Sequence, residues 1–201
     1  MINKNNAFIL ALCATLLGGC ASTGTPLSTT GVAAYSDTIE LSGRLTINFE
    51  KDGKPDTLTG KFSWSQSPAG VDVNLASPLG QTIATINVKP GVATLTQSGS
   101  APRVAADIDS LTAQTLGWSL PVSGLRDWLQ GYATAADGTR FAASPASNSV
   151  TTPDGWRLTF VSWHEAQGGA ARPAPRRIDA QRSASAGAGE LTIRIVVDPK
   201  A

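Results

Sequence analysis

The chain has few of the side chains that metal binding and most catalysis require. Its 201 residues include one histidine and two cysteines. A zinc site takes several His or Cys ligands, so we expect no metal site. The sequence contains no Gly-x-Ser-x-Gly motif and no glycine-rich phosphate loop. We therefore assign no catalytic residue, expect a protein that is not an enzyme and needs no cofactor, and interpret His164 as a surface or interstrand residue.

Charge is also scarce. Charged residues make up 15% of the chain, and the formal net charge of +1 falls to 0 when Lys4 is removed with the leader described below. Proteins that bind nucleic acid usually carry a basic patch or stripe, so the composition predicts no nucleic-acid partner. The sequence does contain one group of arginines in an Ala/Gly/Pro-rich stretch, which we expect to be a solvated loop or edge strand: Arg172, Arg176, Arg177 and Arg182.

The amino-terminal apolar run at residues 7–17 is shorter than the ~20 residues that a membrane-spanning helix needs. It follows a basic residue, so residues 1–19 are predicted to be a cleavable signal peptide. The run ends in Leu17-Gly18-Gly19-Cys20, which resembles the lipobox of bacterial lipoprotein precursors. We expect lipidation at Cys20; the alternative is an ordinary secretory signal with an unrelated cysteine.

The residues that follow the lipobox indicate the membrane to which the protein is sorted and the tether that joins it to the folded domain. Ala21, rather than aspartate, follows Cys20, and this resembles the enterobacterial pattern for sorting to the outer membrane. Cleavage would leave Cys20 as the sole cysteine, so no intramolecular disulfide can form. Residues 20–36 are rich in Ser, Thr, Gly and Ala and are predicted to be a lipidated flexible tether. One folded domain, residues 37–201, is expected to follow it.

Beyond the tether, apolar and polar side chains alternate with a period of two, which is typical of strands with one buried face. Turn sequences such as Asp52-Gly53 and Lys89-Pro90-Gly91 separate the alternating runs. Many short strands at nearly regular spacing favour a meandering antiparallel sheet that curls into a barrel or half-barrel. The predicted strands are 39–50, 57–64, 71–75, 83–88, 92–96, 155–163 and 191–197.

The period becomes helical over residues 107–131, in two pieces divided by Pro121. In the second piece Ser123 is the expected N-cap, and Gly131 is suited to the C′ position. This short helix must lie against the sheet, where it either fills the hollow of the sheet or gates it. Its apolar residues occur at the i, i+3, i+4 spacing: Leu125, Trp128 and Leu129.

An ordered set of motifs over residues 39–197 resembles the LolB family, the outer-membrane lipoprotein receptors of the lipoprotein localisation pathway. The motifs are Gly60-Lys61-Phe62-Ser63-Trp64, Leu75-Ala76-Ser77-Pro78-Leu79-Gly80-Gln81-Thr82, Leu116-Gly117-Trp118-Ser119-Leu120-Pro121-Val122, Leu125-Arg126-Asp127-Trp128-Leu129-Gln130-Gly131, Asp154-Gly155-Trp156 and Trp163. Each motif alone is weak, and the set in this order is specific.

The resemblance implies a mainly β fold, an incomplete antiparallel β-barrel (half-barrel) that encloses a hydrophobic cavity and is covered by short helices. It also implies that the protein accepts acylated lipoprotein cargo from a soluble LolA-like periplasmic carrier and delivers it to outer-membrane phospholipid. The expected location is the periplasmic face of the outer membrane, with a lipid anchor and a monomeric state. No bond is made or broken in this reaction.

The residues predicted to contact acyl chains come from these motifs and from the final predicted strands. Simple core packing is the alternative for each aromatic residue. The candidates are Phe62, Trp64, Leu75, Leu116, Trp118, Trp128, Leu129, Trp156 and Phe160. Leu79, at the tip of the Ser77–Gly80 turn, is by resemblance the residue that enters the membrane; its alternative is a hydrophobic plug folded back onto the sheet.

Two other functions remain open from the residues alone. One is a structural or envelope-assembly lipoprotein that binds a protein partner through its apolar sheet face. The other is a hydrolase of envelope lipids or glycans, which would need a perturbed acid or nucleophile that the sequence does not reveal. A basic patch around Arg103 or around Arg176 is the expected docking surface for the carrier.

Overall fold

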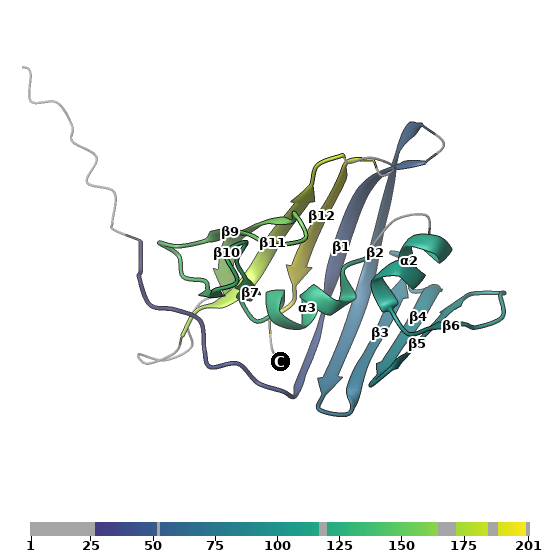
Figure 1. Ribbon diagram of the computed structural model, residues 1–201, viewed down its shortest axis with the longest axis horizontal. Helices are drawn as coiled ribbons and strands as arrows, with labels where there is room; N and C mark the ends of the chain where they lie inside the picture. The colour runs from purple at the N-terminus through teal and green to yellow at the C-terminus, as the bar shows by residue number, and fades with distance from the viewer. Residues whose placement is uncertain (1–26, 52, 117–119, 165–171, 185–188, 200–201) are drawn as a thin grey trace, which may run out of the picture.

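The computed structural model describes residues 27–51, 53–116, 120–164, 172–184 and 189–199 (Figure 1). Their main feature is one antiparallel sheet of ten strands, in the order β6-β5-β4-β3-β2-β1-β12-β11-β10-β9, beside a two-stranded hairpin, β7-β8. The strands of the first half are β1 (Ile39–Lys51), β2 (Lys54–Ser67), β3 (Gly70–Ala76), β4 (Thr82–Lys89), β5 (Val92–Gln97) and β6 (Arg103–Ala105).

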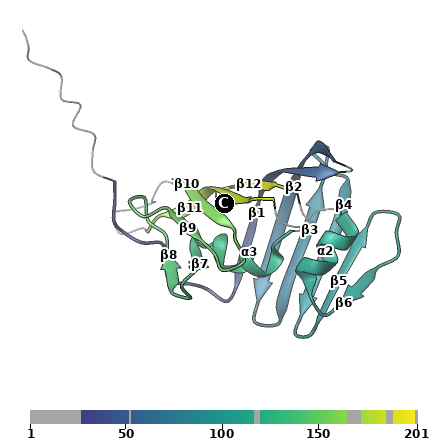
Figure 2. The ribbon, with the colours of Figure 1, turned by 45° about the horizontal axis from the view of Figure 1, so that its top comes forward.

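The second half contains the helices and the remaining strands: α2 (Ile108–Leu116), α3 (Val122–Trp128), β7 (Tyr132–Thr134), β8 (Arg140–Ala142), β9 (Ser149–Thr151), β10 (Arg157–His164), β11 (Ala174–Arg182) and β12 (Leu191–Val197). The two ends of the sheet, β6 and β9, do not pair with each other, so the sheet stays open. Figures 1 and 2 show α2 and α3 across the same face of this curved sheet. The predicted half-barrel covered by short helices is thus confirmed.

Strand β1 joins the two halves of the chain. It pairs along its full length with β2, where Leu45 lies opposite Gly60, and on its other side with β12, where Leu45 lies opposite Ile195. Every strand predicted from the period of two is present within a few residues. The alternation succeeds because one face of each strand lies in the core and the other faces water.

Strand β11 was missed, and the expectation for its arginines is wrong. Arg176, Arg177 and Arg182 lie in β11, which pairs with β10 on one side and β12 on the other, so it is neither a loop nor an edge strand. The buried positions of β11 include a proline and an alanine, Pro175 and Ala180, which weaken the apolar period that the prediction relied on.

The helices form as expected, but α3 is capped differently. Its N-cap residue is Pro121, which supplies no side-chain hydrogen bond, and Ser123 lies inside the first turn. The predicted Ser123 cap is therefore wrong; a carboxylate from α2 replaces it, as described below. Gly131 has the predicted positive φ, at 82°, although it lies two residues after the C-cap residue Leu129. In the described ranges no helix is long and apolar enough to cross a bilayer.

Residues 28–36, which we call the N-terminal strap, have no helix or strand but lie against the domain. Val32 is buried, and its amide donates to the carbonyl of Ala143 at 3.0 Å. The amide of Ala146 donates to the carbonyl of Ser28 at 3.0 Å. A flexible tether was expected as far as Ser36; in the structure the apolar and aromatic side chains of this segment have partners on the domain.

Candidate apolar binding site

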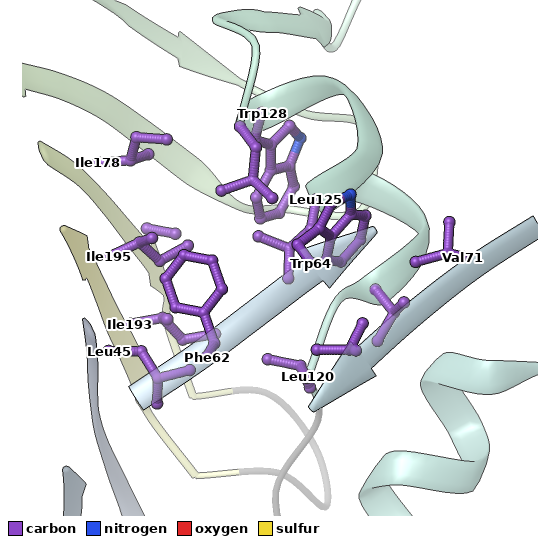
Figure 3. Packing of buried hydrophobic residues seen from close by; sticks show 14 of the residues in the cluster. Leu45, Phe62, Trp64, Val71, Leu120, Leu125, Trp128, Ile178, Ile193 and Ile195 are labelled. Atoms are coloured by element: carbon purple, nitrogen blue, oxygen red, sulfur yellow. The ribbon is translucent and has the colours of Figure 1, made fainter. Parts of the chain in front are cut away.

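The candidate site is a hollow between α3 and the covered face of the sheet, which we call the α3 hollow. Strands β1, β2, β3 and β12 form its floor, and α3 with its flanking residues forms its roof. Figure 3 shows Phe62 and Trp64 rising from β2 toward α3. The hollow is lined by Leu45, Phe62, Trp64, Val73, Leu75, Leu120, Leu125, Leu129, Ile193 and Ile195.

The α3 hollow is almost completely filled by its own side chains. The space open to a water-sized sphere is about 20 Å³, enough for roughly one water molecule. Sites for organic ligands occupy on the order of 300–1,000 Å³. Leu120, Leu125 and Leu129 line the hollow from the roof and leave no room for such a ligand. The hollow can therefore hold an acyl chain only after the roof has moved.

The floor of the hollow is shaped by a small residue beneath a large one. Phe62 lies opposite Gly43 in the β1–β2 register. A Cβ atom added at Gly43 would lie 2.7 Å from the Phe62 ring and 2.2 Å from the carbonyl oxygen of Val196. Any larger residue at position 43 would displace the ring, so the absence of a side chain there allows Phe62 to form part of the wall.

The structure sorts the predicted cavity residues into three groups. Phe62, Trp64, Leu75 and Leu129 line the hollow. Trp128, Trp156 and Phe160 are buried and do not line it, so contact of these three with an acyl chain stays a prediction. The side chains at Leu116 and Trp118, and the lipidation site Cys20, lie outside what the structure describes. Sequence reasoning omitted several wall residues that share a face with predicted ones: Leu45, Val73, Leu120, Leu125, Ile193 and Ile195.

Trp128, Trp156 and Phe160 belong to a packed cluster between α3 and the β9–β11 end of the sheet. Trp128 and Trp156 meet edge to face, with ring centroids 5.7 Å apart. Phe160 stacks between Phe141 at 6.2 Å and Trp163 at 6.1 Å. Such pairs add roughly 0.5–1.5 kcal/mol beyond their burial. In the structure these rings pack against one another.

Polar contacts from α2 fix the amino-terminal end of the roof. The buried hydroxyl of Thr112 accepts from the amide of Leu120 at 3.1 Å and donates to the carbonyl of the same residue at 3.2 Å. The carboxylate of Asp109 accepts from the amide of Ser123 at 3.2 Å and also from its hydroxyl. Burial raises the pKa of Asp109, and the hydrogen bonds from Ser123 only partly offset this.

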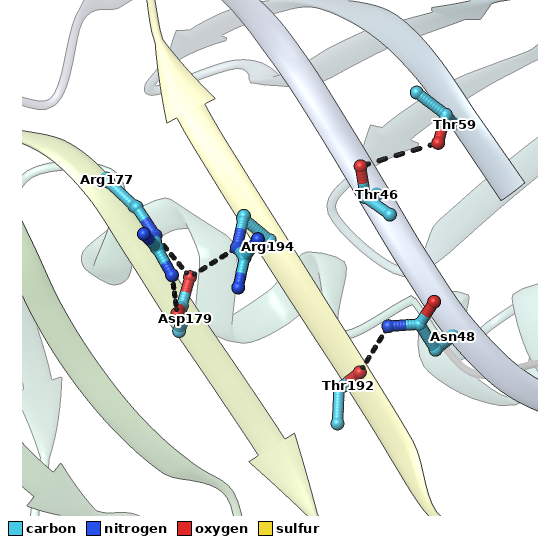
Figure 4. Close-up of polar contacts among 7 residues, drawn as sticks. All are labelled: Thr46, Asn48, Thr59, Arg177, Asp179, Thr192 and Arg194. Atoms are coloured by element: carbon cyan, nitrogen blue, oxygen red, sulfur yellow. Dashed lines mark hydrogen bonds and ion pairs between the residues drawn. The ribbon is translucent and has the colours of Figure 1, made fainter. Parts of the chain in front are cut away.

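The opposite face of the sheet has a different chemistry (Figure 4). On this face Asp179 of β11 forms ion pairs with Arg177 at 2.6 Å and with Arg194 at 3.2 Å. Burial by itself would raise the pKa of Asp179, but the hydrogen bonds and charges of the two arginines outweigh burial and lower the pKa. Arg177 therefore has a structural role in the sheet rather than a free cationic one.

A larger surface groove also lies on that polar face, with a volume of about 860 Å³. Its walls include Glu40, Asp72 and Asp198. Carboxylates in contact with an acyl chain would lose hydration without a compensating partner. The groove is thus unsuited to an apolar ligand despite its size, and the α3 hollow remains the candidate site.

Leu79 lies at the tip of the turn between β3 and β4, with 91% of its surface exposed. The turn is closed by the amide of Gly80, which donates to the carbonyl of Ser77 at 2.9 Å, and by the amide of Ser77, which donates to Gln81 at 2.7 Å. The leucine is therefore not folded back onto the sheet. An exposed leucine on a well-ordered turn presents apolar area to whatever the turn meets.

The remaining sequence candidates do not assemble into a second site. His164 is half-buried at the end of β10. No group of three His, Cys, Asp or Glu side chains able to hold a metal ion occurs among residues placed by the structure. Arg103 lies on the edge strand β6, whereas Arg176 lies on β11, near the other end of the sheet. The two expected basic docking patches are thus separate surfaces.

Fold and site together define the class of the protein: an open antiparallel half-barrel whose apolar face is roofed by short helices. Residues 37–199 match the family model described as outer membrane lipoprotein LolB. The chain belongs to the LolB family of outer-membrane lipoproteins, as the motif resemblance predicted.

Individual relatives match this chain over most of their length. The outer-membrane lipoprotein LolB of Cupriavidus taiwanensis is 36% identical over 188 residues, which cover 92% of this chain and 91% of the relative. That of Cupriavidus metallidurans is 35% identical and covers 100% of this chain and 98% of the relative. Among solved structures, a LolA superfamily protein from Nitrosomonas europaea has a TM-score of 0.43 at 9% identity, covering 84% of this chain and 87% of that protein.

Proposed function

We propose that this chain receives acylated lipoproteins from a LolA-like periplasmic carrier, shelters their acyl chains in the α3 hollow and passes them to the inner leaflet of the outer membrane as a monomer. Membership in the LolB family supports the receptor role. The observation that carries the proposed site is a hollow whose walls are all apolar, beneath a short helix on an open sheet.

The energetics of the cargo explain why a receptor is needed. A triacylated lipoprotein carries ~40 methylene groups, and at ~0.8 kcal/mol each their exposure to water costs on the order of 30 kcal/mol. Direct transfer from one apolar site to another avoids that exposure. Direction then comes from tighter binding in the acceptor than in the carrier, and tighter still in the bilayer.

Entry of an acyl chain requires displacement of the roof. The free space of about 20 Å³ cannot admit it, so Leu125 and Leu129 must withdraw from the hollow that they line together with Phe62 and Trp64. The acyl chain would then replace these leucines against the same apolar walls. Because one apolar contact is exchanged for another, the net cost of opening in the presence of cargo is small.

Two features would hold the receptor at the membrane. The lipid on Cys20 would anchor the chain, and Leu79 would enter the phospholipid during delivery. Burying one leucine recovers roughly 1.5–3 kcal/mol. That free energy is too small to anchor the protein, but it is enough to orient the turn toward the bilayer at the moment of release.

The experiment uses the mature lipidated chain, a carrier loaded with lipoprotein, and phospholipid vesicles. Leu79→Glu is expected to leave carrier-to-receptor transfer unchanged and to slow incorporation of cargo into vesicles severalfold, because a carboxylate resists burial in lipid. The matched control is Val104→Glu, at a residue that is 63% exposed on the edge strand β6. Equal impairment of both steps, or of neither, would remove the membrane role of Leu79.

The acyl-binding site is tested separately with Leu125→Lys, which places a charge in the roof of the hollow. Transfer of cargo from the carrier to this variant should fall at least tenfold, because the ammonium group must be desolvated when the acyl chain enters. Far-ultraviolet circular dichroism checks that the sheet remains folded. A folded variant that accepts cargo normally would show that the acyl chains bind elsewhere, whereas a wild-type chain that accepts no cargo would favour a structural lipoprotein that binds protein partners.

A further inference from the structure

The N-terminal strap, residues 28–36, forms its first contact with the turn that follows α3. The amide of Val32 donates to the carbonyl of Ala143, whose own amide donates to the carbonyl of Gly131 at 2.8 Å. A Cβ atom at Gly131 would lie 2.6 Å from Val32, and the φ of Gly131 is +82°. Glycine is thus required there by both backbone conformation and the close approach of the strap.

An aromatic and charged cluster forms the second contact. Tyr35 meets Tyr132 of β7 edge to face at 5.9 Å, and the Tyr132 hydroxyl donates to the carbonyl of Ala33 at 2.6 Å. The guanidinium of Arg140 lies 5.3 Å from the Tyr35 ring centroid and 4.9 Å from that of Tyr132. Arg140 also pairs with Asp127 of α3 at 2.9 Å, so this cluster connects the strap to the helix.

The third contact joins the strap directly to the end of the roof. The side-chain oxygen of Gln130, which follows α3, accepts from the amide of Ser36 at 2.9 Å. The side-chain nitrogen of Gln130 donates to the carbonyl of Ser36 at 3.0 Å and to that of Arg126 in α3 at 3.3 Å. One amide side chain thus binds both backbone groups of a strap residue and a helix carbonyl. Figures 1 and 2 show the strap, in purple, beside the β7–β8 hairpin on its way to β1.

The two ends of α3 are therefore fixed in unequal ways. At the amino-terminal end, the Thr112 hydroxyl and Leu120 backbone are buried, and breaking their hydrogen bonds leaves polar groups unpaired away from water. At the carboxyl-terminal end, the Ser36–Gln130 and Ala33–Tyr132 hydrogen bonds are exposed. Water can replace these two hydrogen bonds at little cost, although release of the strap also exposes Val32 and leaves the buried amide of Gln66 without Tyr35. Of the polar contacts that fix α3, those at this end are therefore the easier to break.

We propose that the N-terminal strap is a releasable lock that holds the carboxyl-terminal end of α3 over the hollow, so that peeling of the strap precedes opening of the roof. The strap continues directly into the segment that leads to the expected anchor at Cys20. The state of the membrane-proximal chain and the opening of the hollow are then coupled. The claim that acyl chains enter when the hollow opens rests on the proposed function. The lock itself does not depend on that function.

The test is amide hydrogen exchange on the full mature chain, followed at Leu125 and Leu129, whose amides donate within α3. Gln130→Ala and Tyr35→Ala should each speed exchange at these two amides, by roughly tenfold for Gln130→Ala, while core sheet amides such as Ile47 keep their rates. Thr30→Ala, at an exposed strap residue, is the matched control and should change neither set.

Unchanged exchange at α3 in both variants, or equal acceleration at α3 and Ile47, would overturn the lock. Gln130 also bonds to α3 itself, whereas among the residues that the structure describes the Tyr35 side chain contacts Tyr132, Arg140 and the buried amide of Gln66 but no residue of α3. Tyr35→Ala therefore decides between loss of the strap and fraying of the helix. Cargo transfer is measured in parallel. If the variants exchange faster at α3 but the chain never accepts cargo, the proposed function alone is wrong. If cargo transfer is normal and the exchange rates at Leu125 and Leu129 do not change, the lock alone is wrong.

Discussion

The sheet and its helical roof differ in what holds them in place. The sheet is continuous: β1 pairs along both edges, and Ile47 at its centre is fully buried. The roof consists of two short helices fixed at their ends by a handful of polar contacts. A helix of seven residues has little stability of its own. From this difference we expect the sheet to be the more stable part of the molecule and the roof to be the part that opens first.

The largest expected effect is in the floor. Ile47→Ala should lower the free energy of unfolding by about 2–5 kcal/mol, because it leaves a cavity between β1, β2 and β12. Urea denaturation measures this. Thr46→Ala, on the outer face of the same strand, is the matched control and should stay within roughly 0.5 kcal/mol. Similar losses in both variants would mean that the sheet is not the stable half of the molecule.

A smaller and more local effect is expected in the roof. Thr112→Val keeps the shape of the side chain but leaves the buried amide of Leu120 unpaired, at a cost of about 1–3 kcal/mol. Hydrogen exchange should accelerate in α2 and α3 more than in the sheet. Gln114→Ala, on the exposed side of α2, serves as the control. If exchange accelerates equally at the amides of the sheet, the roof and the sheet unfold as one unit and do not differ in stability.

The smallest expected effect is that the contributions of Asp109 and Asp179 to the free energy of unfolding change in opposite directions with pH. Burial raises the pKa of Asp109 above its ordinary value of 3.8. The folded state then binds this proton more readily than the unfolded state. The contribution of Asp109 to stability should therefore rise as the pH falls through the window between the raised pKa and 3.8.

Asp179 should behave in the opposite way. Its pKa lies below 3.8 because of Arg177 and Arg194, so its contribution is complete above 3.8 and is lost as the pH falls through the lowered pKa. Urea denaturation of the wild type against Asp109→Asn and Asp179→Asn, from neutral pH downward, isolates each contribution. Two slopes of the same sign would show that the carboxylates of roof and floor do not differ as described.

How much could be predicted from the sequence differs along the chain. In β1 to β5 the alternation of side chains was strong and the turns carried glycine or proline, so strands and hairpins were predicted closely. In β11 the inward positions include Pro175 and Ala180, and the surrounding stretch is rich in alanine and arginine. A period that depends on large apolar residues cannot detect such a strand.

The site was predicted in part for a similar reason. Phe62, Trp64 and Leu75 were assigned to the wall because they lie on one face of predicted strands. Trp128 was assigned from the helical spacing of α3 and Trp156 from the start of a predicted strand, but these two rings pack edge to face against each other and do not line the hollow. Which aromatic rings come into contact depends on which elements become neighbours in the fold. A local sequence pattern does not contain that information.

The amino-acid sequence by itself determined the strand periods, the apolar face of α3, the exposed leucine of the β3–β4 turn and the motifs of the family, because each of these is a property of residues close together along the chain. Only the tertiary structure decided that β1 pairs with β12, that α3 fills the hollow, that Asp109 reaches Ser123 and that the strap reaches Gln130. These are contacts between distant segments. Their geometry follows from how the whole sheet curves and twists.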